Sequence, residues 1–427
     1  MRRERAEKPQ PADIGRPVAA ATRREWIARA RALKPLLEAN AEEIERTRTI
    51  PGPVLDALHA AQIFRTVMPR SVGGAELDPA THAQVVAAIA EGDASVAWCV
   101  AQAACASMAS GYVEPQVARK IFGDPRAVFT FGYTRGEPPC LAVPVDGGWI
   151  INGTWTFGSG NRAATWLGGH CRLCDASGTP LKHPDGRFVE RTMLFPRSAA
   201  TVDDASWDVM GLCGTGSDTY RVSDLFVPTD HSVIPRVSAR DHNLPDGVVA
   251  APEPERRERG ILYRHSMQLV ASCGLSSVAI GAAQAMLDAF IPLARQKTPS
   301  NSIALRDDGW IQARVAQADA KISSAKAWLV QLLEEAWEEC AADGAVSLPL
   351  RIKLRQACTH QIDSARDAAD ILFRDAGATA IFRSNPFERR FRDVHTVSIQ
   401  VQGSIARMQS AGQFYLGLTP QQLILVP

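Results

Sequence analysis

Apolar residues follow a helical period at both ends of the chain and a strand period in the middle. From residue 22 to 122 they recur every three or four positions, and they do so again from 263 to 427, which predicts amphipathic helices. Between 123 and 235, short runs of β-branched and aromatic residues are separated by turn residues, which predicts strands. The sequence therefore predicts an α+β protein with an N-terminal helical domain, a middle β-sandwich or β-barrel domain, and a C-terminal four-helix bundle.

Two segments lie outside these periodic stretches. Residues 1–21 are charged and rich in proline, and we expect a loose tail. Residues 236–262 are polar and again rich in proline. We therefore expect a surface loop between the β-domain and the bundle, in a position to act as a lid.

The strongest helical pattern lies in the predicted bundle. A helix over about 310–341 carries apolar residues at alternating spacings of four and three, which is typical of a bundle seam. Further helices are predicted over about 263–296, 349–376 and 393–417, which gives an antiparallel four-helix bundle. The seam residues are Ile311, Val315, Ala318, Ile322, Ala325, Leu329, Leu332 and Ala336.

A hairpin is predicted in the β-domain over residues 149–157. The pair Asn152–Gly153 is the strongest short turn signal between two strands. The chain continues as Gly158–Ser159–Gly160, where one hydroxyl stands between two residues without side chains. A flat ligand can approach such a backbone closely and meet the hydroxyl, although an ordinary glycine-rich hairpin end has the same pattern.

Composition and charge narrow the function. With 47 basic and 46 acidic residues the formal net charge is +1, so no global field favours nucleic acid or an anionic membrane. No apolar signal core is visible, and no apolar run reaches the roughly 18 residues of a membrane span. Nine scattered cysteines fit reduced thiols in a cytoplasmic protein. Cys171 and Cys174 have a metal-like spacing, but they point to opposite faces of a strand and lack a second pair, so no metal is expected.

Several motifs, in this order and spacing, resemble the acyl-CoA dehydrogenase superfamily. The predicted hairpin is similar to the strand and turn before that family's flavin-contacting Trp-Ile-Thr/Ser, and residues 157–159 stand at the place of this triplet. Segments 207–217 and 222–228 are similar to a second family motif, and residues 377–378 with the later Arg392–Asp393 to a third. The resemblance covers nearly the whole chain and implies the family's fold.

The superfamily contains dehydrogenases and two-component flavin-dependent monooxygenases, and the residues favour the second branch. A dehydrogenase needs a carboxylate to remove the α-proton of its substrate. Gln402 stands where most dehydrogenases of the family have glutamate, and the alternative place, segment 271–284, has no acid. His395, two residues after Asp393, and the Ser159 loop resemble the monooxygenase branch. An acyl-CoA dehydrogenase and a non-catalytic flavin- or ligand-binding homologue are the alternatives.

The resemblance implies a role for each site residue. A C4a-hydroperoxide formed from reduced flavin and O2 survives only if water is excluded and flavin N5 is held in a hydrogen bond, and Ser159 is expected to hold it. His395 is expected to take a proton from the substrate or give one to the leaving hydroxide. Trp98 is expected beside flavin and substrate, with Cys105 and Ala106 in the substrate pocket. A turn hydroxyl, a surface histidine and a core tryptophan are the corresponding structural interpretations.

The cofactor is expected to be reduced FMN or reduced FAD. No strand–glycine-rich loop–helix unit for a nicotinamide cofactor is visible, so a separate NAD(P)H:flavin reductase must deliver the reduced flavin. Arg295 and Arg392 are candidate phosphate ligands, with Arg389 as an alternative to Arg392, although each can equally be a surface side chain. The family implies a homotetramer built on the bundle and a small, largely aromatic substrate. The residues expected to contact flavin are Phe157, Gly158, Ser159, Ser217, Arg295 and Arg392.

Overall fold

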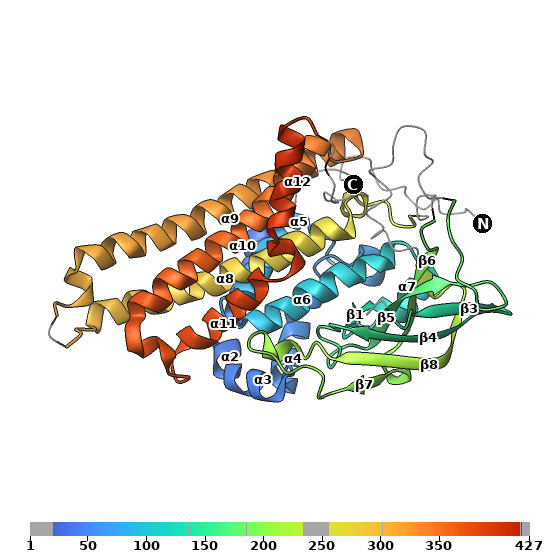
Figure 1. Cartoon of the computed structure of the whole chain (residues 1–427), viewed down its shortest axis with the longest axis horizontal. Coiled ribbons are helices and arrows are strands. Elements are labelled where there is room, and N and C mark those ends of the chain that lie inside the picture. Colours follow the sequence, from blue (N-terminus) through green and yellow to red (C-terminus); the bar gives the residue numbers. More distant parts are fainter. Residues whose placement is uncertain are drawn as a thin grey trace, which may run out of the picture.

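The computed structural model in Figure 1 describes residues 20–134, 137–184, 186–233, 256–300, 302–418 and 420. The predicted tail, apart from its last two residues, and residues 236–255 of the predicted loop lie outside this part of the chain. The arrangement of the described residues confirms the predicted α+β fold, with helices before and after a central sheet.

The first part of the described chain is helical. Its helices are α1 (Ala20–Ala32), α2 (Lys34–Ala39), α3 (Ala41–Thr47), α4 (Gly52–Ala60), α5 (Pro79–Ala90), α6 (Ala94–Ser107) and α7 (Pro115–Phe122). Asp93 begins α6 by accepting a hydrogen bond from the Val96 N–H at 2.9 Å. Nearly every side chain of α6 is buried, because both of its faces pack against other elements.

The middle of the chain forms one mixed sheet. Its strands are β1 (Phe129–Phe131), β2 (Tyr133–Thr134), β3 (Leu141–Val145), β4 (Gly148–Thr156), β5 (Trp166–Leu173), β6 (Glu190–Pro196), β7 (Thr201–Asp203), β8 (Thr219–Pro228) and β9 (Ser232–Val233). They are hydrogen-bonded in the order β7-β8-β4-β3-β5-β6-β9, with β1 paired to β5 and β2 to β4. β3 lies antiparallel to β4 and parallel to β5.

The predicted turn at Asn152–Gly153 is wrong, because β4 runs through it as one strand. β3 and β4 instead meet at residues 146–147, where Gly147 has a φ of 74°. Asn152 lies opposite a bulge in β8, where its side chain donates to the Asp224 carboxylate at 3.2 Å and accepts from the Asp224 N–H at 2.9 Å. Pairing with strands on both sides therefore keeps extended a dipeptide that favours a turn locally.

Long helices form the last part of the chain. They are α8 (Met267–Gln296), α9 (Gly309–Asp343) and α10 (Leu348–Ala376), followed by the shorter α11 (Pro386–Ser398) and α12 (Ile405–Tyr415). The single helix predicted over 393–417 is wrong, because a short turn over 401–403 separates α11 from α12. The predicted seam of α9 is buried in the core of the chain, with Val315 partly buried at its edge.

α6 and α8 connect the helical layers to the sheet. Figure 1 shows α6 between the long helices and the strands, and it contacts both α8 and β1. α8 is long and apolar enough to cross a membrane by composition alone, but 89% of its most apolar window is buried inside the protein. This burial is typical of the core helix of a globular protein.

Candidate functional site

Ser159 lies in the loop that follows β4. The backbone turns sharply here, with a φ of 56° at Phe157 and of 75° at Gly160. Gly158 has no room for a side chain, because a Cβ atom would stand 2.8 Å from Cε1 of Tyr220. Only 4% of Ser159 is exposed, so the loop places this hydroxyl among other buried groups.

A line of hydrogen bonds joins Ser159 to two other segments. The Trp98 indole N–H donates to Ser159 Oγ at 3.0 Å, and Ser159 Oγ lies 2.7 Å from Ser217 Oγ. Ser217 Oγ lies 2.7 Å from Thr215 Oγ1, which donates to the Leu212 carbonyl at 2.7 Å. The structure therefore brings together Trp98, Ser159 and Ser217, three predicted site residues that lie far apart in the sequence.

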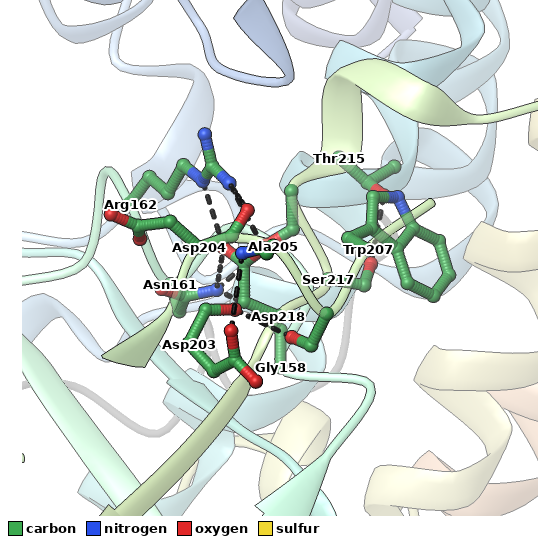
Figure 2. A network of polar contacts seen from close by, with 12 residues as sticks. Gly158, Asn161, Arg162, Asp203, Asp204, Ala205, Trp207, Thr215, Ser217 and Asp218 are labelled. Carbon is green, nitrogen blue, oxygen red and sulfur yellow. Dashed lines mark hydrogen bonds and ion pairs between the residues drawn. The ribbon is translucent and has the colours of Figure 1, made fainter. Parts of the chain in front are cut away.

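A second network fixes the backbone of the same loop (Figure 2). The Asn161 amide donates to Gly158 O at 2.9 Å, to Gly216 O at 2.6 Å and to Asp218 Oδ2 at 3.1 Å. Arg162 donates to both Asp218 oxygens, at 2.7 and 3.0 Å. These contacts offset the cost of burying the Asp218 carboxylate. They also tie the loop after β4 to the loop before β8.

Aromatic side chains reach the surface near Ser159 and Ser217. Phe157 is 58% exposed, and its ring meets Trp207 edge-to-face with 5.9 Å between ring centroids. Figure 2 shows Trp207 next to Thr215 and Ser217. Large apolar side chains gathered at a surface mark a binding site. A hydroxyl beside them fits a flat aromatic ring that carries a polar ring atom, as a flavin does.

α11 holds the loop that contains Leu212. The Leu212 N–H donates to Asp393 Oδ1 at 2.6 Å. Gly211 lies so close to α11 that a Cβ atom would stand 2.4 Å from Arg392 O. Burial, followed by the neighbouring Asp93 carboxylate, raises the pKa of Asp393 to about 7. The Arg392–Asp393 motif was noted in the sequence, but its contact with the Leu212 loop was not predicted.

The two predicted phosphate ligands differ in their surroundings. Arg392 donates to both oxygens of Glu388, at 2.8 and 3.1 Å, and pairs with Glu45 at 2.7 Å. These ion pairs occupy the guanidinium and count against a role in binding phosphate. Arg295 lies exposed in the last turn of α8, where it stays a candidate.

His395 has a carboxylate partner that the sequence analysis missed. Its Nε2 lies 2.9 Å from Asp370 Oδ1 of α10, and its ring centroid lies 4.2 Å from that of Phe391. Among the described residues, no hydrogen bond joins His395 to Ser159. Asp370 was missed because only the packing of α10 against α11 brings the two side chains together.

The predicted pocket residues of α6 are buried. Cys105 and Ala106 lie two turns beyond Trp98 on the same helix, and Cys105 Sγ donates weakly to the Met267 carbonyl at 3.6 Å. Cys171 and Cys174 are also buried and free. Within the described ranges, no group of three or more His, Cys, Asp or Glu side chains is placed to hold a metal ion.

Gln402 belongs to a different buried cluster. Its Oε1 accepts hydrogen bonds from the Arg355 guanidinium and from Ser272 Oγ, the latter at 3.1 Å. Its backbone carbonyl accepts from Arg355 Nη2 at 3.0 Å and from Thr359 Oγ1 at 2.9 Å. Both oxygens of the residue that stands where dehydrogenases have their base are thus engaged by structural partners.

Comparisons with known proteins agree with this arrangement. The acyl-CoA dehydrogenase N-terminal domain profile matches residues 25–120, and the C-terminal domain profile matches residues 273–402. An indole-3-acetate monooxygenase of Pseudomonas putida is 29% identical over 380 residues, covering 88% of this chain and 90% of the relative. The flavin-dependent monooxygenase oxygenase subunit HsaA of Rhodococcus jostii (strain RHA1) is 28% identical over 395 residues, covering 91% of this chain and 98% of the relative.

A solved structure shares the fold. XiaF from Streptomyces sp., in complex with FADH2 and glycerol, superposes with a TM-score of 0.81 at 24% identity, covering 96% of this chain and 98% of that one. The two profiles together match more than half of the 427 residues, and the chain belongs to the acyl-CoA dehydrogenase superfamily. Its curated relatives confirm the predicted similarity to the flavin-dependent monooxygenase branch.

Proposed function

We propose that this chain is the oxygenase component of a two-component flavin-dependent monooxygenase. It accepts reduced flavin from a separate reductase and, with O2, adds one oxygen atom to a small aromatic molecule, while the second oxygen atom leaves as water. The observation that carries the proposal is the Ser159 hydroxyl, buried in a line of hydrogen bonds beside the exposed Phe157 ring. Relatives over most of the chain that are named as flavin-dependent monooxygenases support it.

Each residue of the site has its own role in the proposed reaction. Reduced flavin, when bound, supplies the electrons that activate O2. Phe157 and Gly158 provide a flat contact surface, and Ser159, supported by Ser217, contacts the ring nitrogen. His395, oriented by Asp370, exchanges a proton with the substrate or the departing oxygen.

The substrate side of the site is apolar. Trp98, Cys105 and Ala106 lie on one face of the buried helix α6, at spacings that place them one above the other. An apolar wall of this kind suits an aromatic substrate and excludes water, which would otherwise divert activated oxygen to free peroxide.

The dehydrogenase alternative lacks a base at position 402, where most dehydrogenases of the family have one. Gln402 is an amide, and its side-chain oxygen is engaged by Arg355 and Ser272. An amide cannot remove the α-proton of an acyl-CoA. We therefore favour oxygenation over desaturation.

Cofactor delivery and assembly follow from the same proposal. The cofactor is reduced FAD or reduced FMN, with Arg295 as the candidate phosphate ligand; a solved relative binds FADH2. Exposed apolar side chains near the C-terminus support a homotetramer, because they are large and uncovered: Ile399 is 82%, Ile405 77% and Leu416 79% exposed. Nine free cysteines support a reducing, cytoplasmic location.

Isotope incorporation tests the function. The protein is loaded with reduced FAD or FMN without oxygen, mixed with O2 of a heavy isotope and a panel of phenols and indoles, and the products are analysed by mass spectrometry. We expect one heavy oxygen atom in an aromatic product. Anaerobic reduction of bound oxidised flavin by an acyl-CoA, with no oxygen incorporated from any aromatic compound, would contradict the proposal.

A further inference from the structure

The hydrogen bonds at Ser159 have only one consistent direction. A hydroxyl carries one hydrogen and can donate once. Thr215 Oγ1 gives its hydrogen to the Leu212 carbonyl, which can only accept. Ser217 must therefore donate to Thr215, and its own hydrogen is then committed.

The same reasoning fixes Ser159. Because the Ser217 hydrogen points to Thr215, the 2.7 Å contact between the two serine oxygens must be a donation from Ser159 to Ser217. The Trp98 indole N–H can only donate, and it donates to Ser159 Oγ at 3.0 Å. One lone pair is the only hydrogen-bonding capacity that Ser159 Oγ has left.

Flavin N5 changes its hydrogen-bonding character with redox state. Reduced flavin carries a hydrogen on N5, whereas N5 of oxidised flavin is a bare acceptor. We propose that the directed chain from Trp98 to the Leu212 carbonyl makes Ser159 an acceptor only, so that this site selects reduced over oxidised flavin. The inference rests on the proposed function, since it requires that Ser159 faces the flavin ring nitrogen.

This selectivity is what an oxygenase component supplied by a diffusing cofactor needs. Reduced flavin is retained until it has reacted, and oxidised flavin meets a lone pair and is released to the reductase. Thr215 is the residue that sets the direction, because its donation to Leu212 is the only one that ends on an obligate acceptor. Thr215 is 2% exposed, and it acts through Ser217 as a positioning residue.

The decisive variant is Thr215→Val, which keeps the shape of the side chain and removes its hydroxyl. Ser217 then loses its acceptor and can donate to Ser159, whose own hydrogen becomes available to the bare N5 of oxidised flavin. Dissociation constants for reduced and oxidised FAD and FMN are measured by anaerobic titration. We expect the ratio of the oxidised to the reduced constant to fall about tenfold, the size of one hydrogen bond. The midpoint potential of bound flavin should fall in the variant, because reduced flavin loses affinity relative to oxidised flavin.

Two further variants keep the test specific. Thr215→Ser restores a hydroxyl and should restore the ratio, and Ser217→Ala, which breaks the next link, should lower it as Thr215→Val does. Thr359→Val is the matched control, because Thr359 of α10 is a buried threonine that donates to the Gln402 carbonyl. It should leave the ratio unchanged, even if it lowers the melting temperature.

The outcomes separate the inference from the function on which it rests. If wild type binds both flavin forms and Thr215→Val and Ser217→Ala weaken or preserve both equally, the directional chain does not set selectivity. If wild type binds neither form of either flavin, the proposed function fails and the inference fails with it.

Discussion

Two buried polar clusters in this protein have opposite relations to a ligand. Around Ser159, hydroxyls pass hydrogen bonds along a line that ends at Leu212 and leaves one lone pair open, beside the exposed Phe157. Around Gln402, both oxygens of the residue accept hydrogen bonds from the buried Arg355, so its acceptors serve the fold. Burial and polarity alone therefore do not mark a catalytic group; an unused acceptor beside exposed aromatic surface does.

The Gln402 cluster also explains why a family motif changes its role. Burial lowers the pKa of Arg355 to about 10, and no carboxylate pairs with its guanidinium among the described residues. The amide oxygen of Gln402 accepts from the guanidinium in place of a carboxylate. The position that carries a base in dehydrogenases thus stabilises a buried cation here.

Removing that acceptor should have the largest effect on stability. In Gln402→Leu, the Arg355 guanidinium remains buried but loses the Gln402 amide oxygen, and its remaining side-chain contact is the long one to Ser272 Oγ at 3.3 Å. We expect the free energy of unfolding to fall by about 3 kcal/mol, as measured by urea denaturation. An unchanged midpoint would show that the Gln402 cluster does not stabilise the fold.

Asp393 accepts a hydrogen bond from the N–H of Leu212, the residue at which the Ser159 line of hydrogen bonds ends. We expect it to make the stability of the protein depend on pH. Its folded pKa of about 7 is raised above the ordinary value of 3.8 by burial and Asp93, while the Leu212 N–H, Arg389 and Arg392 act in the opposite direction. The stability that this group contributes is therefore complete below the unfolded pKa and is lost as pH rises through the folded one.

Asp393→Asn removes this titration and keeps an oxygen that can accept from the Leu212 N–H. As the pH rises from about 5 to about 8, the unfolding free energy of the variant should increase relative to that of wild type by on the order of 2 kcal/mol. Thermal unfolding across that range measures the gain. A difference between variant and wild type that stays constant with pH would argue that Asp393 does not titrate there.

Restoring a carboxylate at the dehydrogenase position should stabilise the protein without creating a dehydrogenase. In Gln402→Glu the new carboxylate pairs with Arg355, and a charge-assisted hydrogen bond exceeds a neutral one by about 1 kcal/mol. We expect a higher melting temperature and no reduction of bound flavin by acyl-CoA under anaerobic conditions. Flavin reduction in this variant would mean that position 402 still faces the ligand.

The smallest effect is expected from a serine in the Gln402 cluster. Ser272→Ala removes the Ser272 hydroxyl, which donates to Gln402 Oε1 at 3.1 Å. The loss should cost about 1 kcal/mol of unfolding free energy and leave flavin binding as in wild type. Weaker flavin binding in this variant would remove the distinction between the two clusters.

The sequence predicted the fold and several members of the Ser159 cluster, because several short motifs have the order and spacing found in the acyl-CoA dehydrogenase superfamily. Trp98, Ser159 and Ser217 were each chosen from a motif, and the structure places them in hydrogen-bond contact. Their contact with flavin, and the role of His395, stay predictions. Asn152–Gly153 was misread because strand pairing, which the sequence does not display, overrode a local turn preference.

The remaining site residues depend on contacts between distant segments. Thr215 reaches Leu212 because Leu212 has a φ of 54°, a left-handed conformation that leucine rarely adopts and no local pattern predicts. Asp393 meets the Leu212 N–H only through the docking of α11. Asp370 meets His395 only where α10 packs against α11.

The most direct test of the account is the time course of flavin reoxidation in wild type and Ser159→Ala. Protein loaded with reduced flavin is mixed with O2, and the absorbance of oxidised flavin is followed, with Ser272→Ala as the matched control. We predict that oxidised flavin appears after a clear delay in wild type and in Ser272→Ala, and about tenfold sooner in Ser159→Ala, because one hydrogen bond is lost. Oxidised flavin that appears on wild type as fast as it does in free solution, with stoichiometric free peroxide, would contradict the account.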